Sequence, residues 1–367
     1  MADTREAAQT PPTIYDVARA AGVSIASVSR VLNGRRNPRE ETRERVLQAV
    51  AELGFVPDGA ARALSGRLKE VVGVVIRRVR WVEATDGVFA EEDESLIYTD
   101  VINRGIEFAA QRQGFNLLLS SVDVDDHDVS RRLLALARKT DGLILHDRVL
   151  DPDQLDHLSR QVPVVTLANV ATASTTNVHG DNSSGMRELA KHLLADHGYR
   201  TLGYLAGLAD SPDSIARGEA IAAEAAAAGA TLLSGPQWQG NYYAAGGARV
   251  IEGLIADGAV LPRAIACAND ETALGVLYAL ARHGIDVPGD VAVTGFDDIL
   301  MARHLRPQLT TVRQPIQKIG ATAFDMLHSL IISGTVAERD ITLPTQLIIR
   351  ESCGCPPPSG LTTARVA

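Results

Sequence analysis

Near the N-terminus, apolar residues recur with the period of an α-helix, at Ile14, Val17, Ala18 and Ala21. Thr13, followed three residues later by Asp16, is a capping-box-like start for this helix, in which the Thr13 hydroxyl would accept from an exposed amide. Gly22 suits a turn because it tolerates a positive φ. The pattern predicts a short helix that ends in a tight turn.

A second short helix is predicted over residues 25–32, between the good N-cap Ser24 and the helix-ending pair Asn33 and Gly34. Three side chains can face inward, at Val28, Val31 and Leu32. The opposite stripe consists of Ile25, Ala26, Ser29, Arg30 and Asn33. Two helices with a free polar face are typical of a helix-turn-helix DNA reader, although many all-α proteins with no nucleic-acid role contain similar pairs.

A third helix is predicted after Pro38, which suits a helix start, and Gly54 would end it. Its apolar face consists of Val46, Leu47, Val50 and Leu53. Three helices with a small shared core are what a helix-turn-helix module needs in order to fold by itself.

From Val71 onward, apolar runs alternate with helical stretches. The runs that indicate buried strands are VVGVVI, FNLLLSS, GLILH, VPVVTL, TLGYLAG, AIACA and VAVTG. Helices are predicted over residues 105–113, 184–197, 215–228, 244–256, 271–283 and 316–332. This alternation implies parallel sheets covered on both faces, and its length exceeds one comfortable doubly wound unit.

Charge is divided unevenly along the 367 residues, whose net charge is −9. Residues 1–67 carry a balance of +2 and the remainder carries −11. Six arginines gather on the second and third predicted helices and their connection: Arg30, Arg35, Arg36, Arg39, Arg43 and Arg45. We expect them to lie near phosphates, while the acidic body repels DNA and confines binding to the N-terminal module.

No apolar run approaches the roughly 18 residues that a membrane span needs, and the N-terminal segment lacks a signal-peptide core. We therefore expect a cytoplasmic, nucleoid-associated protein. The three cysteines are too few and too scattered for a disulfide framework, and Cys267 should be a core residue. Cys353 and Cys355 could bind a metal, but we see no other ligands grouped nearby and expect an unstructured tail with no metal site.

Several motifs together resemble the LacI (lactose repressor) family of bacterial transcriptional regulators. They are YDVARAAGVSIASVSRVLNG, TRERVLQAVAELGFVPD, ARALSG, DGLILH, GDNSSG, CANDETALGVLYAL, VPGDVAVTGFDD, RPQLTTVRQP and LPTQLIIRES. The resemblance covers nearly the whole chain. It implies an N-terminal all-α helix-turn-helix headpiece with a hinge helix, followed by a two-lobed α/β effector domain like a type I periplasmic binding protein, with ligand in the cleft between lobes.

The domain boundaries that we expect are a disordered arm over 1–12, a DNA-binding domain over 13–57 and a hinge over 58–69. A ligand-binding and dimerisation domain would follow over 70–352, with a flexible tail over 353–367. In the family, paired hinge helices enter the minor groove and a leucine wedges between bases; the matching residue is Leu64, with Ala61 beside it. Asp58 replaces the usual Asn, and an ordinary linker is the alternative reading of this segment.

The expected DNA-binding residues are Thr13, Tyr15, Ser24, Ile25, Ala26, Ser29, Arg30, Asn33, Ala61 and Leu64. Arg30 is suited to guanine, and Ile25 and Ala26 to thymine methyl groups. Thr13, Ser24 and Asn33 are available for phosphates.

The expected ligand-binding residues are Tyr98, Thr99, Asn169, Arg217, Tyr242 and Asp270. Asp270 follows a strand and could accept from ligand hydroxyls, with a simple N-cap as the alternative. Arg217 matches the family arginine that donates two hydrogen bonds to sugar hydroxyls or to a carboxylate of the ligand. Tyr242 matches a family aromatic residue that stacks on the ring of the ligand.

Three features depart from the sugar-responsive pattern. Ala168 stands where many members have Asp, and Ala220 with Ile221 replaces a Gly-aromatic pair. Residues 83–100 form an acidic insertion without Lys or Arg, which we expect to be a solvated loop, with a lid or a site for a cationic group as alternatives.

Catalysis is not expected, because the chain has no phosphate-binding loop, dinucleotide fingerprint, nucleophile elbow or His-rich metal spacing. Asp297 and Asp298 are the best acid pair, but adjacent residues rarely aim at one atom, and the family uses this segment structurally. We expect a homodimeric repressor without a cofactor that binds a palindromic operator and is released by a small molecule, with a sugar as the leading candidate. The alternatives are a co-repressor-dependent regulator with a purine-type ligand, and a periplasmic-type sugar-binding protein.

Overall fold

The computed structural model describes residues 12–32, 39–55, 68–78, 97–123, 126–146, 148–168 and 175–356. The chain divides into two compact units, Met1–Lys69 and Glu70–Ala367. Within these described ranges, the helices are too short or too polar to cross a membrane.

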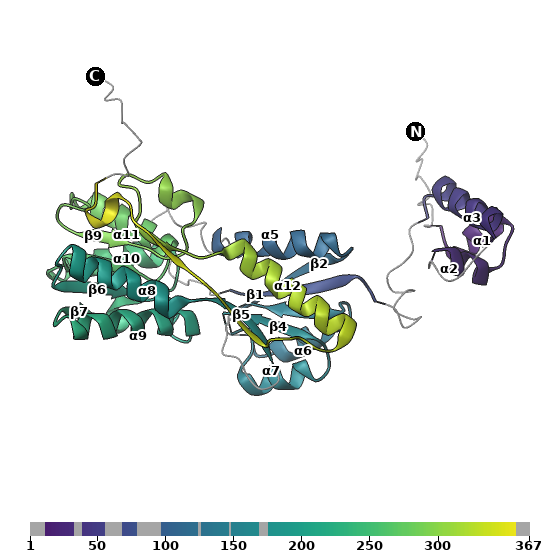
Figure 1. Ribbon diagram of the computed structural model, residues 1–367, viewed down its shortest axis with the longest axis horizontal. Coiled ribbons are helices and arrows are strands. Elements are labelled where there is room, and N and C mark those ends of the chain that lie inside the picture. The colour runs from purple at the N-terminus through teal and green to yellow at the C-terminus, as the bar shows by residue number, and fades with distance from the viewer. Residues whose placement is uncertain are drawn as a thin grey trace, which may run out of the picture. The chain divides into compact units, whose positions relative to one another are not determined.

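The described residues of the first unit form three helices, α1 (Ile14–Ala21), α2 (Ile25–Leu32) and α3 (Glu40–Leu53), as Figure 1 shows. Their shared core consists of Val17, Ala18, Ala21, Val28, Val46 and Ala49. Gly22 and Gly54 end α1 and α3 with φ of 63° and 62°. The predicted helix-turn-helix module is therefore confirmed, but on α3 the predicted core residues Leu47 and Leu53 are exposed and Ala49 is buried instead.

The first lobe of the second unit is built on a parallel six-stranded sheet in the order β11-β5-β4-β3-β1-β2. Its strands are β1 (Val71–Arg78), β2 (Asn116–Asp123), β3 (Gly142–Leu145), β4 (Val164–Leu167), β5 (Thr176–Gly180) and β11 (Asp340–Leu343). Helices α5 (Ile97–Arg112) and α12 (Ile316–Ser333) lie side by side on one face (Figure 1). Helices α6 (Val129–Ala137) and α7 (Pro152–Ser159) pack on the other.

The second lobe has a parallel four-stranded sheet in the order β7-β6-β8-β9. Its strands are β6 (Thr201–Leu205), β7 (Thr231–Leu233), β8 (Ala264–Cys267) and β9 (Ala292–Thr294). Helices α8 (Asn182–Lys191) and α9 (Pro212–Ala227) cover one face, and α10 (Ala244–Ala256) and α11 (Asp270–Arg282) cover the other. Two buried cores result, one on each face of the sheet.

The chain passes between the lobes three times. It crosses after β5, after β10 (Thr311–Arg313) and after β11, and β10 pairs antiparallel with β12 (Gln346–Ile348) beside these crossings. Neither lobe is therefore one continuous segment of sequence.

Some elements differ from the predictions. The helix predicted from residue 105 begins at Ile97, and the one predicted over 184–197 is α8 followed by a π-helical turn, His192–Asp196. The helices α6 and α7 and the strands β5, β7, β10, β11 and β12 were not predicted. These strands are only three to five residues long, and β5 (TNVHG) and β11 (DITL) mix polar with apolar residues. The two predicted parallel α/β lobes are nevertheless confirmed.

Candidate nucleic-acid interface and ligand cleft

Helix α2 presents a polar and small-residue stripe at the surface. Ser24 caps the helix, because the amide of Ser27 donates to its Oγ over 3.2 Å. Val28 on the inner face is fully buried. On the outer face, Ile25, Ala26 and Arg30 are exposed and Ser29 is half-buried. The described residues of the predicted stripe therefore lie at or near the surface of the module.

The start of α1 is also exposed. The amide and the hydroxyl of Thr13 both donate to Asp16 Oδ2, over 2.9 and 2.7 Å, and these hydrogen bonds lower the pKa of Asp16. The capping box predicted from the sequence is therefore present at the start of α1. Tyr15 is 64% exposed. Asn33, Ala61 and Leu64 lie outside the described residues, as does most of the acidic insertion.

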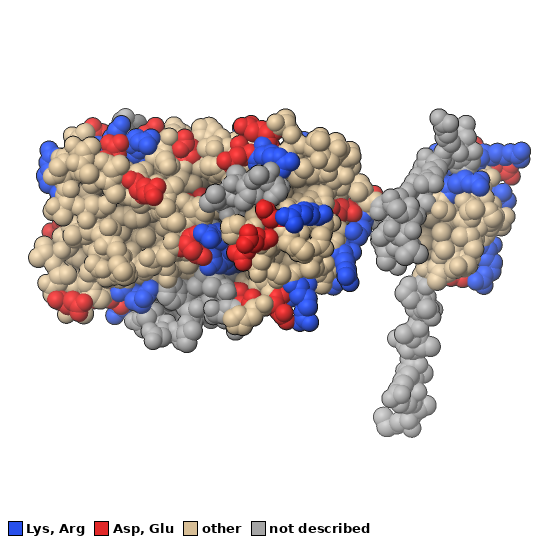
Figure 2. Space-filling view, turned by 90° about the horizontal axis from the view of Figure 1, so that it is seen from below, with Lys and Arg blue, Asp and Glu red and all other residues tan. Residues whose placement is uncertain are grey.

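Figure 2 shows the charged side chains on one face of the molecule. Both basic and acidic side chains lie on the described surface of the first unit, and both kinds are also mixed over the second.

A cleft in the second unit is lined by residues from both lobes. The first lobe contributes Ile76, Arg77, Tyr98, Thr99, Ile102, His146, Leu167 and Ala168. The second contributes Leu208, Ser211, Asp213, Arg217, Asn241, Tyr242, Tyr243, Asn269, Glu271 and Asp297. Of the predicted ligand residues, the structure brings together Tyr98, Thr99, Arg217 and Tyr242; Asn169 lies outside the described residues.

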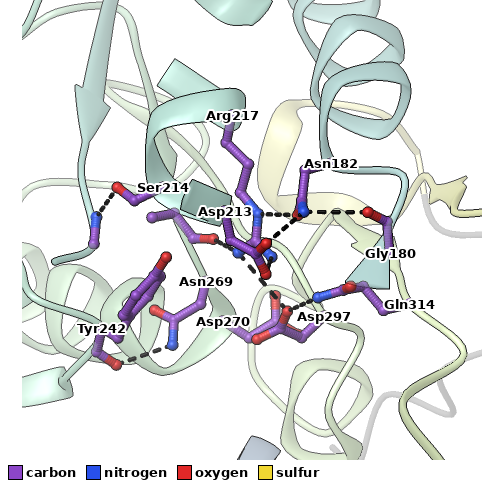
Figure 3. A network of polar contacts seen from close by, with 12 residues as sticks. Gly180, Asn182, Asp213, Ser214, Arg217, Tyr242, Asn269, Asp270, Asp297 and Gln314 are labelled. Carbon is purple, nitrogen blue, oxygen red and sulfur yellow. Dashed lines mark hydrogen bonds and ion pairs between the residues drawn. The ribbon is translucent and has the colours of Figure 1, made fainter. Parts of the chain in front are cut away.

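Arg217 is fixed by the protein around it (Figure 3). Its Nε donates to Asn182 Oδ1 over 2.7 Å and its Nη1 donates to the carbonyl of Ala268 over 2.6 Å. Asp213 Oδ2 lies 3.5 Å from Nη2, and the guanidinium lies 3.8 Å from the centre of the Phe296 ring. Because Nε and one N–H of Nη1 already donate to protein oxygens, the bidentate contact with a ligand that we expected would have to use the remaining N–H groups of Nη1 and Nη2.

Tyr242 lies on a tightly built loop of the cleft. Its φ is 74°, its hydroxyl lies 2.9 Å from Ser211 Oγ, and its carbonyl accepts from Asn269 Nδ2 over 2.9 Å. A Cβ on Gly207 would lie 2.2 Å from the Tyr242 ring. The ring position therefore depends on a glycine at residue 207.

Asp270 does not line the cleft, so its predicted role is wrong. The side chain is fully buried, and Oδ2 accepts from the amide of Ile299 over 2.9 Å. Its neighbours Asn269 and Glu271 line the cleft instead. Asn269 is also the N-cap of α11, because its Oδ1 accepts from the amide of Thr272 over 3.0 Å.

The adjacent acids Asp297 and Asp298 have different surroundings. Asp298 is buried and accepts from two arginines: its Oδ1 lies 2.5 Å from Arg350 Nη2 and its Oδ2 lies 2.7 Å from Arg313 Nε. These contacts agree with a structural role for Asp298. Asp297 lines the cleft, and Gln314 Nε2 donates to its Oδ1 over 2.8 Å (Figure 3). Burial raises the pKa of Asp297 to about 7, although the positive charge of Arg217 opposes the shift. Asp297 is a cleft residue that the sequence analysis missed.

Several contacts among the described residues join the lobes across the cleft, and in one of them the amide of Ile97 donates to Glu271 Oε1 over 2.5 Å. Arg77 Nη2 lies 2.8 Å from Asp210 Oδ2, and Arg148 Nη1 donates to the carbonyl of Asp210 over 2.9 Å.

His146 lines the cleft, and its Nε2 lies 3.2 Å from Asn103 Oδ1. Burial lowers the pKa of His146 to about 4. The imidazole is therefore neutral at pH 7.

The positions that depart from the family pattern divide into two groups. Ala168 lines the cleft with a φ of 54°, so the missing carboxylate leaves an apolar wall there. Ala220 and Ile221 are buried in the core between α9 and the sheet.

The expected unstructured tail does not begin at Cys353. Cys353 is fully buried at the end of a short 3-10 helix, Glu351–Cys353, and Cys355 is half-buried. The expectation that no other ligands gather there is also wrong, since His192 and His197 lie beside both cysteines. Residues 357–367 lie outside the described part of the chain.

Comparison with family models gives two matches. Residues 13–58 match the bacterial regulatory proteins of the lacI family, and residues 190–353 match the periplasmic binding protein-like domain.

Relatives match over nearly the whole chain. Catabolite control protein A of Priestia megaterium is 31% identical over 345 residues, covering 93% of this chain and 98% of the relative. The ribose operon repressor of Haemophilus influenzae is 30% identical with the same coverage.

Two solved structures are also similar to this chain over most of its length. The Lac repressor dimer bound to operator and the anti-inducer ONPF has a TM-score of 0.77 at 26% identity, covering 94% of this chain and 99% of that chain. The complex of the regulator CelR with cellobiose has a TM-score of 0.63 at 28% identity, covering 93% and 99%.

Proposed function

Because this chain belongs to the LacI family of DNA-binding transcriptional regulators, which are not enzymes, we propose that it is a homodimeric repressor released from a palindromic operator by a small neutral ligand. The observation that carries the proposal is the presence, in one chain, of an exposed second helix of a helix-turn-helix module and an interlobe cleft lined by both charged and apolar side chains.

Helix α2 would read the major groove. Arg30 can donate twice to guanine, and Ile25 and Ala26 can contact thymine methyl groups. The exposure of all three supports this assignment. Thr13, Ser24 and Asn33 would contact phosphates, with Tyr15 and Ser29 beside the groove. Ala61 and Leu64 would form the minor-groove wedge.

A dimer would place two copies of α2 on the two halves of a palindrome. The Lac repressor, to which this chain is similar over 94% of its length, is a dimer on its operator in the solved complex. This similarity supports the same assembly here.

The charges of the cleft favour a neutral, hydroxyl-rich ligand, with a carbohydrate as the leading class. The lining residues among the described part of the chain include Arg77 and Arg217 but also Asp213, Glu271 and Asp297. Each arginine lies near a carboxylate: Arg77 is 2.8 Å from Asp210, and Arg217 is 3.5 Å from Asp213. An anion would gain no net attraction, whereas hydroxyl groups can donate to carboxylates and accept from Asn269.

Ligand binding would act through the relative position of the lobes. A ligand that contacts both lobes stabilises one cleft geometry, and the crossing segments transmit this change to the hinge. Coupling of about 1–3 kcal/mol would change operator affinity about 5–150-fold.

Operator selection and ligand screening test the proposal together. Duplexes are selected from a random library on the full-length protein, and its thermal stability is then measured with neutral monosaccharides and disaccharides, sugar phosphates and nucleobases. The proposal expects a palindromic consensus, and one neutral sugar that raises the melting temperature with dose and releases the operator. Stabilisation by a nucleobase that tightens operator binding would support the co-repressor alternative. Selection of no preferred duplex would contradict DNA regulation itself.

A further inference from the structure

Two histidines and two cysteines meet in the second lobe, at the end of α8. The cluster consists of His192, His197, Cys353 and Cys355, whose potential ligand atoms all lie within 4.8 Å of one another. None of these four residues lines the ligand cleft.

Four of the six distances among these ligand atoms are close to the edges of a tetrahedron around one ion. Zinc bonds of about 2.0–2.1 Å to nitrogen and about 2.3 Å to sulfur give edges of about 3.3 Å between nitrogens and about 3.6 Å between nitrogen and sulfur. The two Nε2 atoms lie 3.2 Å apart. His192 Nε2 lies 3.5 Å from Cys353 Sγ and 3.7 Å from Cys355 Sγ, and His197 Nε2 lies 3.4 Å from Cys355 Sγ.

A π-helical turn makes this geometry possible. In an α-helix, residues five apart point about 140° away from each other. The turn His192–Asp196 instead closes with a hydrogen bond from the amide of His197 to the carbonyl of His192, over 3.3 Å. This bond brings the two imidazoles to one side, and such turns are frequent at functional sites.

Neighbouring groups orient the four side chains. His192 Nδ1 lies 2.8 Å from Asp196 Oδ2, which fixes the proton on Nδ1 and leaves the Nε2 lone pair for a metal. The Tyr199 hydroxyl donates to the carbonyl of Cys353 over 2.8 Å, and the Tyr199 ring stacks on His197. Gly354, with a φ of 103°, joins the cysteines, and a Cβ there would lie 3.0 Å from the Tyr199 hydroxyl.

The Cys353 sulfur also has a hydrogen-bond donor beside it. The Thr310 hydroxyl donates to Cys353 Sγ over 3.1 Å. Thiolate is the form of cysteine that binds metal.

We propose that His192, His197, Cys353 and Cys355 form a structural site for zinc. Nitrogen and sulfur ligands select zinc over calcium or magnesium, and four protein ligands leave no open position for catalysis. The ion would fasten the segment after β12 to the end of α8. This inference is independent of the proposed effector, because the site lies outside the cleft.

Metal analysis of the full-length protein, purified without chelator, tests the site. We expect one zinc ion per chain, and after replacement by cobalt(II) the strong visible absorption of tetrahedral thiolate coordination. Cys355→Ser and His197→Gln should lose both signals, whereas Cys267→Ala, which removes a buried cysteine elsewhere in the same lobe, should keep them.

Asp196→Asn provides a variant that should fold, because the Asp196 side chain is 68% exposed. It should bind zinc about 10–100-fold more weakly with one ion still bound at saturation. Absence of bound metal after loading with zinc, unchanged zinc affinity in all these variants, or a disulfide between the two cysteines in the freshly purified protein would overturn the proposal.

Discussion

The Thr311 hydroxyl donates to Asp270 Oδ1 over 2.5 Å, inside the second lobe and away from the ligand cleft. Asp270 thus joins β10 to the start of α11, and its other oxygen accepts from the amide of Ile299. Burial and the nearby Asp297 raise the pKa of Asp270. The carboxyl group is a structural acceptor.

Asp270→Ala should therefore lower the free energy of unfolding, by about 1–3 kcal/mol for each buried donor left without an acceptor. Urea denaturation of the full-length protein measures this change. Glu271→Gln, at the neighbouring position that lines the cleft, is the control and should change ligand affinity more than stability. A stable Asp270→Ala variant that has lost its ligand response would restore the original assignment.

Gly207→Ala should weaken ligand binding, because the added Cβ would lie 2.2 Å from the Tyr242 ring and displace it. Loss of one aromatic contact of about 1 kcal/mol raises the Kd about 5-fold, and calorimetric titration with the identified ligand measures it. Gly253→Ala in α10 is the matched control, since a Cβ there meets no atom within 4 Å. Equal affinities of the two variants would show that the ring position does not matter.

Asp297→Asn should change the pH dependence of stability. Asp297 has a pKa of about 7 when folded, against 3.8 as a model value, so the folded state holds a proton that the unfolded state releases. Its contribution is therefore fully present below about pH 4 and is lost as the pH rises to about 7, with a slope of at most about 1.4 kcal/mol per pH unit. The variant should lose this part of the slope in denaturation series between these pH values. Parallel curves for both proteins would mean that Asp297 is ionised throughout.

Arg30→Ala should relax operator specificity at one symmetric base pair, at a cost of about 1–3 kcal/mol for that pair, while the salt dependence of binding changes little. Fluorescence anisotropy with single-substituted duplexes measures both. Arg19→Ala is the control, because Arg19 is an exposed arginine on α1 that pairs with Asp16. A uniform loss of affinity on every duplex would assign Arg30 to phosphate contact.

The sequence predicted the N-terminal module well because its signals are local. The buried residues Val17, Val28 and Val46 each belong to the apolar face of their own helix. Gly22 and the cap Ser24 lie next to the helices that they end or begin. The strands that lie in longer apolar runs were equally visible, since a run such as GLIL in β3 needs no distant partner to be recognised.

The cleft was only partly predictable. A residue that follows a strand lies near the cleft, but the sequence does not say which of Asn269, Asp270 and Glu271 points into it. The hydrogen bonds from Ile299 and Thr311 decide this, and they come from segments that are distant in sequence.

The cluster of His192, His197, Cys353 and Cys355 could not be predicted from the sequence for a similar reason. His192 and Cys353 are 161 residues apart, and a spacing of five between histidines is unfavourable on an α-helix. His192, in the π-helical turn that corrects this spacing, is buried.

The three crossings between the lobes have a consequence for synthesis of the chain. The first sheet needs β11 at its edge, and this strand is made only when residue 343 of 367 has been added. The second lobe, in contrast, has all four strands of its sheet by residue 294. A ribosome-bound chain can thus complete the sheet of its later lobe before that of its earlier one, and truncation before β11 should leave the first lobe open to proteolysis.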